Sequence, residues 1–366
     1  MSNDLIVRGL TKKMLKASID ENTYWNSGFA PITKSKAIWM INNPRIEDND
    51  YCAVIASENN QILSFISLIP DFLNLKNNTY KKMYWMVSWW VNPKVEKTVI
   101  GTYTFYEALK LTNNKIVIKS YAEHIDSFYK KMPFTTIASR YRYTLFLSLD
   151  PSMLIGKFKF LKPVKFIFNA LDHAVYFIIN NLFNKQKLKK STANLKYEYL
   201  NNIDESTWRF MEPLCKNDLI LKTKDYVNWM LDGKQFTQIP VSKKFSYKTI
   251  EIGTSNNIYL HNMKILKENK AIGFLSYIIN YNEFNVKYFL VEKEEDYDEC
   301  VDALIENFII KKARYIFTDD TVLAENIKKR FITVFTHKSL KKGLAHNSLD
   351  LTLDTVSLKN RDGHFY

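Results

Sequence analysis

The residues best placed to do chemistry lie in the stretch 89–109, WWVNPKVEKTVIGTYTFYEAL. Trp89, Trp90 and Val91 favour a strand, Asn92-Pro93 ends it, and residues 101–109 carry a helical pattern. The first backbone N–H groups of a helix have no partner inside the helix, so they can hold an anion such as a phosphate. The spacing therefore predicts an anion site where the strand passes into the helix.

This segment resembles the pyrophosphate loop of the GNAT superfamily of acyl-CoA N-acyltransferases. The family pattern is Val-x-Pro followed by Arg or Gln-x-x-Gly-x-Gly or Ala, and Val91, Pro93 and Gly101 fall at its spacing. Glu96 takes the Arg or Gln position and Val99 takes the first glycine position, so the loop is degenerate. The resemblance implies that acetyl-CoA or another acyl-CoA is held by Val91, Lys97, Thr98, Val99, Ile100, Gly101 and Thr102.

The resemblance covers about residues 5–150. Asn60–Ser67 resembles the second and third strands of a GNAT domain, which meet at a polar hairpin. A strand at 115–119 follows, then a late helix at 127–134, and 141–149 is expected to complete the sheet. The resemblance implies a mixed, mainly antiparallel sheet flanked by helices, with a parallel pair splayed at its centre.

Candidate catalytic residues follow from the same resemblance. In a GNAT enzyme the amine attacks the thioester carbonyl directly, a Tyr of the late helix protonates the leaving thiolate, and a base removes the amine's proton. Tyr129 holds the position of this acid, or it is a buried core aromatic. The strand before the loop offers no carboxylate, so Glu123 and His124, just after the next strand, are the candidate bases. Alternatively, Glu123 is a helix-start charge and His124 a structural residue.

The second half of the chain repeats the first. Asn269–Ser276 aligns with Asn60–Ser67 without a gap, and residues 226–231 echo 37–41. The strand–helix junction at 292–296 is acidic and would repel a pyrophosphate. We therefore expect an α/β chain of tandem GNAT-like domains at 1–150 and 197–366, joined by a basic amphipathic linker at 151–196.

The segment 151–196 differs from the rest in composition. It is rich in Phe, Ile, Leu and Val, it is punctuated by lysines, and its only acid is Asp172. The run without formal charge between Asp172 and Lys185 is shorter than the ~20 residues that span a bilayer. Two interpretations stay open: a helix or helices packed between the domains, or a segment lying in the headgroup layer of a membrane.

Composition narrows the class of protein. The chain has 366 residues and a formal net charge of +14, which favours an anionic partner. Three separated cysteines and six histidines form no metal-binding spacing, and no signal peptide or nucleic-acid-binding module is recognisable. We expect no metal, and cytoplasmic residence, at the inner face of the membrane if 151–196 contacts lipid.

Three functions are compatible with these features. The first is an acyl-CoA-dependent N-acetyltransferase or other N-acyltransferase acting on a small or lipid-linked amine, such as an amino sugar or another cell-envelope precursor. The second is a Fem-type aminoacyltransferase, the one reading in which a nucleic acid, tRNA, is a partner. The third is a non-catalytic binding protein built from two degenerate GNAT domains.

Overall fold

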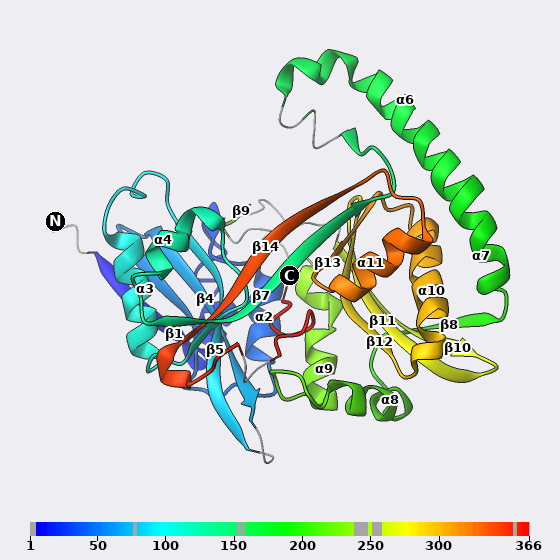
Figure 1. Cartoon of the computed structure of the whole chain (residues 1–366). Coiled ribbons are helices and arrows are strands. Elements are labelled where there is room, and N and C mark those ends of the chain that lie inside the picture. The colour runs from blue at the N-terminus through cyan, green and yellow to red at the C-terminus, as the bar shows by residue number, and fades with distance from the viewer. Residues whose placement is uncertain are drawn as a thin grey trace. The chain divides into compact units, whose positions relative to one another are not determined.

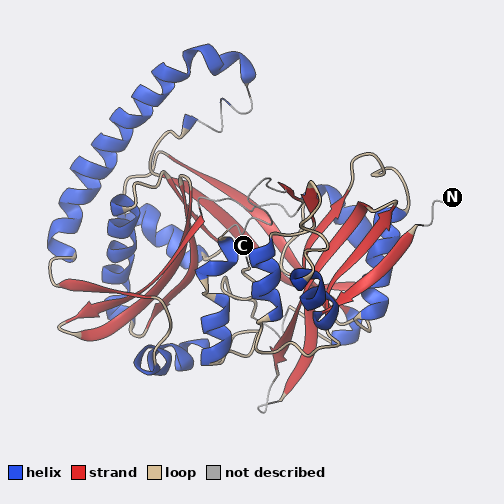
Figure 2. Cartoon of the chain, turned by 180° about the vertical axis from the view of Figure 1, so that it is seen from behind, coloured by secondary structure: helices blue, strands red, loops and turns tan. Residues whose placement is uncertain are grey.

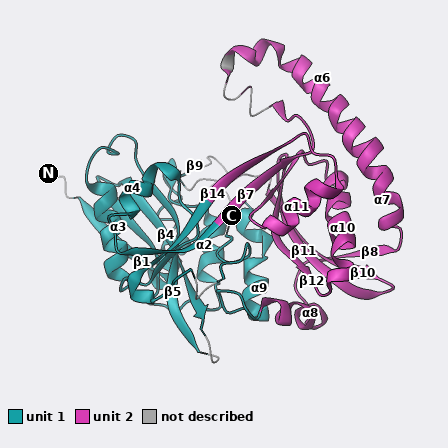
Figure 3. Cartoon of the chain, viewed as in Figure 1, with its two compact units in different colours: residues 1–139, 216–256, 341–366 teal, residues 140–215, 257–340 magenta. Residues whose placement is uncertain are grey.

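The computed structural model describes residues 5–75, 79–151, 155, 158–237, 248–250, 258–353 and 357–365. They form two compact units, and each unit takes segments from both halves of the chain (Figure 3). Unit 1 comprises residues 1–139, 216–256 and 341–366, and unit 2 comprises residues 140–215 and 257–340.

Unit 1 contains a mixed sheet in the order β1-β3-β4-β5-β6-β14, with β7 beside β14 (Figure 1). Only β5 and β6 pair in parallel, whereas the other characterised pairs of this sheet are antiparallel. Its elements are β1 (Ile6–Thr11), α1 (Lys12–Asp20), β2 (Phe29–Ala30), α2 (Lys34–Ile41), β3 (Tyr51–Glu58), β4 (Gln61–Asn74), β5 (Tyr80–Val91), α3 (Ile100–Leu111), β6 (Ile116–Ile118), η2 (Glu123–Ile125), α4 (Asp126–Tyr129), α9 (Lys224–Met230), η5 (Gly233–Phe236), β9 (Lys248–Thr249) and η7 (Asn347–Leu349).

The strands of unit 2 follow the order β7-β13-β12-β11-β10-β8, in which β12 and β13 are the parallel pair. Figure 2 shows the strands of each unit side by side with helices flanking them. Its elements are η3 (Lys159–Val164), α6 (Lys165–Tyr176), η4 (Phe177–Asn184), α7 (Lys185–Ser191), β8 (Leu195–Leu200), α8 (Glu205–Cys215), β10 (Ile258–Lys267), β11 (Lys270–Asn280), β12 (Glu283–Val291), η6 (Glu294–Asp296), α10 (Tyr297–Ile310), β13 (Tyr315–Thr318) and α11 (Thr321–Arg330).

The chain passes from one unit to the other inside two long strands, β7 (Phe134–Phe146) and β14 (Phe335–His346). The last residues of β7 pair with β13, for example Phe146 with Tyr315, and the last residues of β14 pair with β6, for example Leu344 with Ile118. The strand expected at 141–149 is the second half of β7, and its residues 143–146 pair with β13. At 13 and 12 residues, about twice the usual length, each strand is long enough to contribute residues to both units.

These sheets confirm the predicted fold class, α/β with mixed, mainly antiparallel sheets flanked by helices. The domain boundaries predicted at 150 and 197 rest on the order of motifs along the chain, and they stay a prediction. The two compact units are built differently, because each takes segments from both sides of these boundaries. The basic segment expected as a linker contributes its described residues to unit 2.

The central hairpins of the two units have the same local geometry. Asn59 and Asn60 join β3 to β4 at φ 49° and 62°, and Glu268 and Asn269 join β10 to β11 at φ 50° and 63°. Such turns match the twist of a hairpin, and Asn tolerates the left-handed region. Single-residue bulges also recur at corresponding places, at Leu63, Val87, Ile272 and Lys287.

Each unit buries its own apolar core. In unit 1, α3 presents Phe105 and Ala108 to Ile66 and Leu68 of the sheet. In unit 2, α10 presents Leu304 and other apolar residues to β11 and β12. Threonine side chains cap several helices, for example Thr11 at α1 and Thr33 at α2, by accepting a hydrogen bond from a first-turn N–H.

Candidate active site

The candidate site in unit 1 begins where the parallel strands part. β5 and β6 pair at Tyr84–Ile116 and Trp85–Val117, and β5 then continues to Val91 without a further β6 partner among the described residues. A gap between parallel strands leaves backbone groups of β5 without a ladder on that side. An extended ligand can use such groups.

A β-bulge lies at this opening. Ser67 of β4 is opposite Ser88, and the next residue of β4, Leu68, is opposite Met86, so Val87 has no partner in β4. A bulge re-aims backbone groups and is common beside active sites. The Ser67 hydroxyl, in a residue 1% exposed, has no hydrogen-bond partner among the described residues. Sequence reasoning missed the bulge, because a one-residue mismatch between strands leaves no signal in composition.

The predicted anion loop follows the C-terminal end of β5, beyond the opening and the bulge. Lys97, Thr98 and Val99 are exposed, and Val99 is 78% exposed. Thr98 Oγ1 accepts from the N–H of Ile100 at 3.3 Å. Within the described part of the chain no hydrogen bond occupies the N–H groups of Val99, Gly101 and Thr102. The helix start therefore presents donors suited to a phosphate.

Gly101 and Glu96 affect how well the loop can bind a phosphate, in opposite directions. A β-carbon at Gly101 would lie 2.8 Å from Val91 Cγ2, so this glycine lets the start of α3 pack closely on the end of β5. The side chain of Glu96 is exposed and makes no ion pair with any described residue. Its charge therefore opposes an anion at the loop. The loop residues fit coenzyme A through their backbone and Lys97, and Glu96 weakens the fit.

Tyr129 lies in an aromatic cluster between α3, α4 and the sheet. It is 4% exposed, and its ring is 6.0 Å from that of Phe105 and 5.9 Å from that of Phe134. Burial raises the pKa of Tyr129 above its ordinary value, so the phenol keeps its proton at neutral pH. Its hydroxyl makes no hydrogen bond to any described residue, which leaves the proton free to be donated.

A second tyrosine, Tyr121, lies beside it with ring centroids 4.9 Å apart. Tyr121 donates to Asp126 Oδ1 at 2.6 Å, and Lys130 and Lys342 also contact the Asp126 carboxylate, at 2.8 and 3.2 Å. Burial and this carboxylate raise the pKa of Tyr121, and the hydrogen bonds lower that of Asp126. The proton of Tyr121 is thus already engaged in a hydrogen bond, whereas that of Tyr129 is not. Sequence reasoning did not single out Tyr121 or Asp126.

The candidate bases lie outside this cluster. Glu123 and His124 are exposed on η2, which follows the end of β6. Neither side chain makes a hydrogen bond or ion pair with another described residue. The structure therefore does not join these two side chains to Tyr129 or to the loop.

Aromatic rings bridge the parted strands. Trp89 of β5 lies 5.2 Å from Phe105 and 5.3 Å from Phe128 of α4, which follows β6. The Trp89 indole N–H is buried without a hydrogen-bond partner among the described residues. These rings fill apolar space that a ligand in the gap would have to share, and the indole offers it one donor.

Unit 2 repeats the parting without the loop. β12 and β13 pair from Glu283–Tyr315 to Asn285–Phe317 and then separate, with the bulge at Lys287. The junction that follows places Glu294, Glu295 and Asp296 in the first turn of η6. Three carboxylates at a helix start would repel a phosphate, so these residues of unit 2 do not form a phosphate site.

Among the described residues no group of three or more His, Cys, Asp or Glu side chains could hold a metal ion. Cys52, Cys215 and Cys300 are buried and form no disulfide with any described residue, and burial raises the pKa of the Cys52 thiol to about 12. A raised thiol pKa disfavours the reactive thiolate, and burial raises that of Cys300 as well.

No protein-family model matches the chain, and no curated protein matches it significantly. It is similar to a GCN5-related N-acetyltransferase from Kribbella flavida, at 10% identity over 94% of this chain and 71% of that one, with a TM-score of 0.48. It is also similar to a probable N-acyltransferase from Enterococcus faecalis V583, at 9% identity over 93% of this chain and 72% of that one, with a TM-score of 0.47. A third similar structure is a putative acetyltransferase from Pyrococcus horikoshii, at 11% identity over 98% of this chain and 96% of that one, with a TM-score of 0.47. These TM-scores lie below 0.5, so the likeness by itself carries no conclusion about function.

Proposed function

We propose that the protein is an acyl-CoA-dependent N-acyltransferase of the GNAT type, an acetyltransferase in its simplest form, with its donor site in unit 1. One observation carries the proposal: β5 and β6 part beside a bulge at Val87, and the loop after β5 leads to the start of α3. There the N–H groups of Val99, Gly101 and Thr102 make no hydrogen bond among the described residues. A thioester and a pyrophosphate need these two features along one extended path.

Each group of the site then has a role. Bound acyl-CoA supplies an activated thioester. The N–H groups at the start of α3 hold the pyrophosphate, and backbone groups at the Val87 bulge orient the carbonyl. The acceptor amine forms the new C–N bond as the C–S bond breaks. Tyr129 gives its proton to the thiolate, and Glu123 or His124 removes the amine's proton, directly or through water.

The acceptor proposed is the free amine of an amino sugar or another cell-envelope precursor, small or lipid-linked. The net charge of +14 supports an acceptor that carries phosphate, such as a nucleotide-linked or lipid-linked sugar. Reaction on such precursors implies a cytoplasmic enzyme.

We also infer that the two halves of the chain arose by duplication of one GNAT-like domain, and that the second copy lost its donor loop. The matched hairpin turns and bulges and the common order of strands support this. Descent from one domain accounts for the bulges at Val87 and Lys287, which lie at corresponding points of both parallel pairs.

A second candidate function is a binding protein without catalysis. The specific observation in its favour is the bridge of Trp89 and Phe128 across the parted strands, together with the anion Glu96 at the loop. In this case the unit 1 site stays closed to coenzyme A.

Calorimetric titration of the purified chain with coenzyme A, acetyl-CoA and longer acyl-CoAs separates the candidates. The enzyme proposal expects saturable binding and amine-dependent release of free thiol with a panel of amino sugars, nucleotide-linked amino sugars and lysine. If no acyl-CoA binds, the result favours the second candidate, a binding protein without catalysis. Transfer from aminoacyl-tRNA alone would identify the Fem-type reaction instead.

A further inference from the structure

One long helix of unit 2 has an unusual surface. η3, α6, η4 and α7 form a continuous helix, Phe160–Ser191, of 32 residues, which Figure 1 shows along the outside of this unit beside α10. It is long and apolar enough to cross a membrane by length and composition alone, and only 17% of its most apolar window is buried. We refer to it as the outer helix.

The buried side of the outer helix is mostly polar. Its buried residues recur every fourth position, namely Asp172, Tyr176, Asn180, Asn184 and Leu188. Asp172 Oδ1 accepts from the N–H groups of Leu149 and Asp150 at 2.9 and 3.0 Å, and Asn180 Nδ2 donates to Leu147 O at 2.7 Å. Asn184 Oδ1 accepts from the N–H of Ile332 at 3.2 Å. Hydrogen bonds to backbone therefore fix this side to unit 2.

The exposed side is apolar. Phe160 and Phe166 are 75% and 70% exposed. Six further large apolar residues of the helix are at least 46% exposed: Ile167, Leu171, Phe177, Ile178, Leu182 and Phe183. A surface helix normally buries its apolar face and exposes its polar one. The outer helix does the opposite, and a contiguous exposed apolar surface marks a site of interaction.

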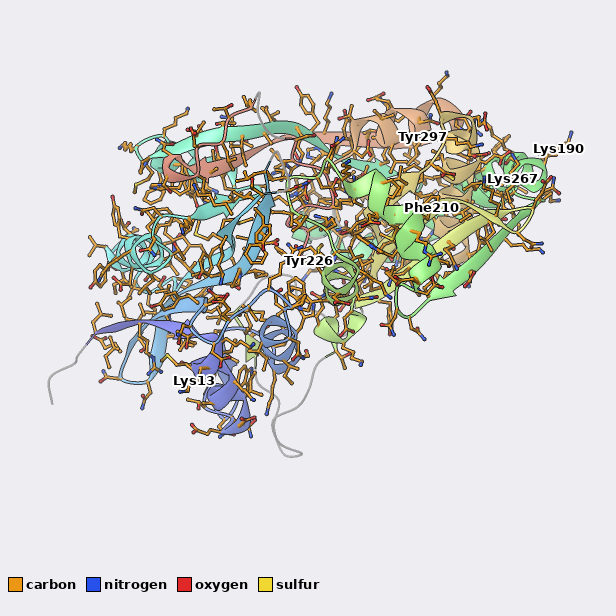
Figure 4. The ribbon with its side chains drawn as sticks, turned by 90° about the horizontal axis from the view of Figure 1, so that it is seen from below. Lys13, Lys190, Phe210, Tyr226, Lys267 and Tyr297 are labelled. Carbon is orange, nitrogen blue, oxygen red and sulfur yellow. The ribbon has the colours of Figure 1, made fainter. Side chains whose placement is uncertain are left out.

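The charge of this exposed side is entirely positive. Its exposed lysines lie toward both ends of the helix, at positions 162, 165, 185, 187, 189 and 190. Figure 4 shows Lys190 at the outer edge of the unit. Asp172, the only acid between 158 and 191, is 6% exposed and lies 3.5 Å from the Arg314 guanidinium. An apolar surface flanked by lysines and free of exposed acid complements an anionic lipid surface.

We propose that the outer helix binds the surface of an anionic membrane and lies parallel to it, with its aromatic and aliphatic side chains at the level of the headgroups. A membrane-spanning orientation would take Asp172, Asn180 and Asn184, with their backbone partners, into the hydrocarbon core. The flat orientation keeps these groups in the protein. Its length of about 48 Å then lies along the membrane.

A cavity beside the helix fits the same partner. It has a volume of about 500 Å³ and lies between the outer helix and α10. Lys185, Lys312 and Arg314 contribute cations to its lining, and Glu306 is the one carboxylate among the lining residues of this described cavity. A phosphate headgroup beside the helix would meet a positive potential there.

Co-sedimentation of the full chain with vesicles tests the proposal without reference to enzymatic activity. The unmodified chain should bind vesicles of phosphatidylcholine with phosphatidylglycerol and bind pure phosphatidylcholine far less, with affinity falling as salt rises. Changing Lys185, Lys187, Lys189 and Lys190 to Gln should weaken binding more than tenfold. The combined change Phe166→Ser, Leu171→Ser and Leu182→Ser should weaken it as much, because these side chains enter the headgroup layer.

The matched control changes four exposed lysines of unit 1, Lys13, Lys16, Lys110 and Lys131, to Gln. Both lysine sets lower the net charge by four, from +14 to +10, so equal weakening by the two sets would overturn a site on the outer helix. Circular dichroism and thermal unfolding check that each variant is folded. Failure of the unmodified chain to bind anionic vesicles at low salt overturns the proposal, and self-association in sedimentation equilibrium would then assign the surface to a second copy of this chain.

Discussion

Trp39 and Trp229 stack with ring centroids 4.2 Å apart and planes 11° from parallel, and each indole N–H donates to the other residue's backbone carbonyl at 2.7 Å. The two residues belong to α2 and α9, both in unit 1, and are 3% and 7% exposed. They occupy corresponding positions in the repeated segments of the sequence. The contact thus pairs one residue with its counterpart from the other half of the chain.

The pair should be a measurable part of the stability of unit 1. Trp39→Phe and Trp229→Phe each remove one donor and leave one buried carbonyl without its partner, at a cost of about 1–3 kcal/mol. The double variant should cost less than the sum, because the two residues are in contact. Urea unfolding followed by circular dichroism gives the three differences. Strict additivity would show that the two hydrogen bonds are energetically independent.

Neutralising Glu96 should strengthen binding of coenzyme A. Its exposed carboxylate at the loop repels the pyrophosphate, and one charge near an anion in water is worth about 1 kcal/mol, so Glu96→Gln should tighten binding roughly two- to tenfold. Calorimetry at low salt measures this, and the gain should shrink as salt rises. Asp20→Asn, an exposed acid at the end of α1, is the control. Equal gains in both variants would indicate a general charge effect and no donor site at the loop.

Local patterns predicted the elements around the site well. The strand, break and helix expected at 89–109 correspond to β5 ending at Val91 and α3 spanning Ile100–Leu111. Period and turn chemistry are local properties, so they are legible in the sequence. The sequence also shows that Trp39 and Trp229 occupy equivalent positions of the repeat. It does not predict their contact, because a repeat shows that two residues are equivalent and not that they lie close together.

Features that depend on pairing over long distances were not predictable. The exchange of β7 and β14 between the units depends on which of several β-rich segments pair, and each would suit either sheet. The bulge at Val87 depends on register with β4. In 151–196 the apolar composition favoured an apolar packing face, yet three polar residues, Asp172, Asn180 and Asn184, make the anchoring hydrogen bonds.

Removing the Tyr129 hydroxyl should slow acyl transfer. A positioned acid contributes about 10²–10⁴-fold, so Tyr129→Phe should lower kcat at least about tenfold, with little change in the KM for acyl-CoA. The fold should survive because the lost hydroxyl has no partner among the described residues. Tyr121→Phe is the matched control, since its hydroxyl is bonded to Asp126. Unchanged thiol release by Tyr129→Phe would assign this residue to packing.

The stability of unit 2 should depend on pH through His261. Burial and the nearby Lys311 charge lower the pKa of His261 from 6.5 to about 4. Its ring lies 5.1 Å from that of Tyr277. Above the ordinary value the ring is neutral in both the folded and the unfolded chain. Between that value and about 4 only the unfolded chain takes up the proton, so the free energy of unfolding falls as the pH falls.

The loss should reach at most about 3 kcal/mol, and less where water screens the partly exposed ring. His261→Phe keeps an aromatic ring beside Tyr277 and removes the titrating group, so its free energy of unfolding should fall less between about pH 7 and about pH 4.5. Denaturant unfolding at several pH values compares the two slopes, with the exposed His337→Gln as control. A slope that is the same in the His261→Phe variant and the unmodified chain would mean that the imidazole is protonated as readily in the folded state as in the unfolded one, and that burial against Tyr277 does not disfavour its charged form.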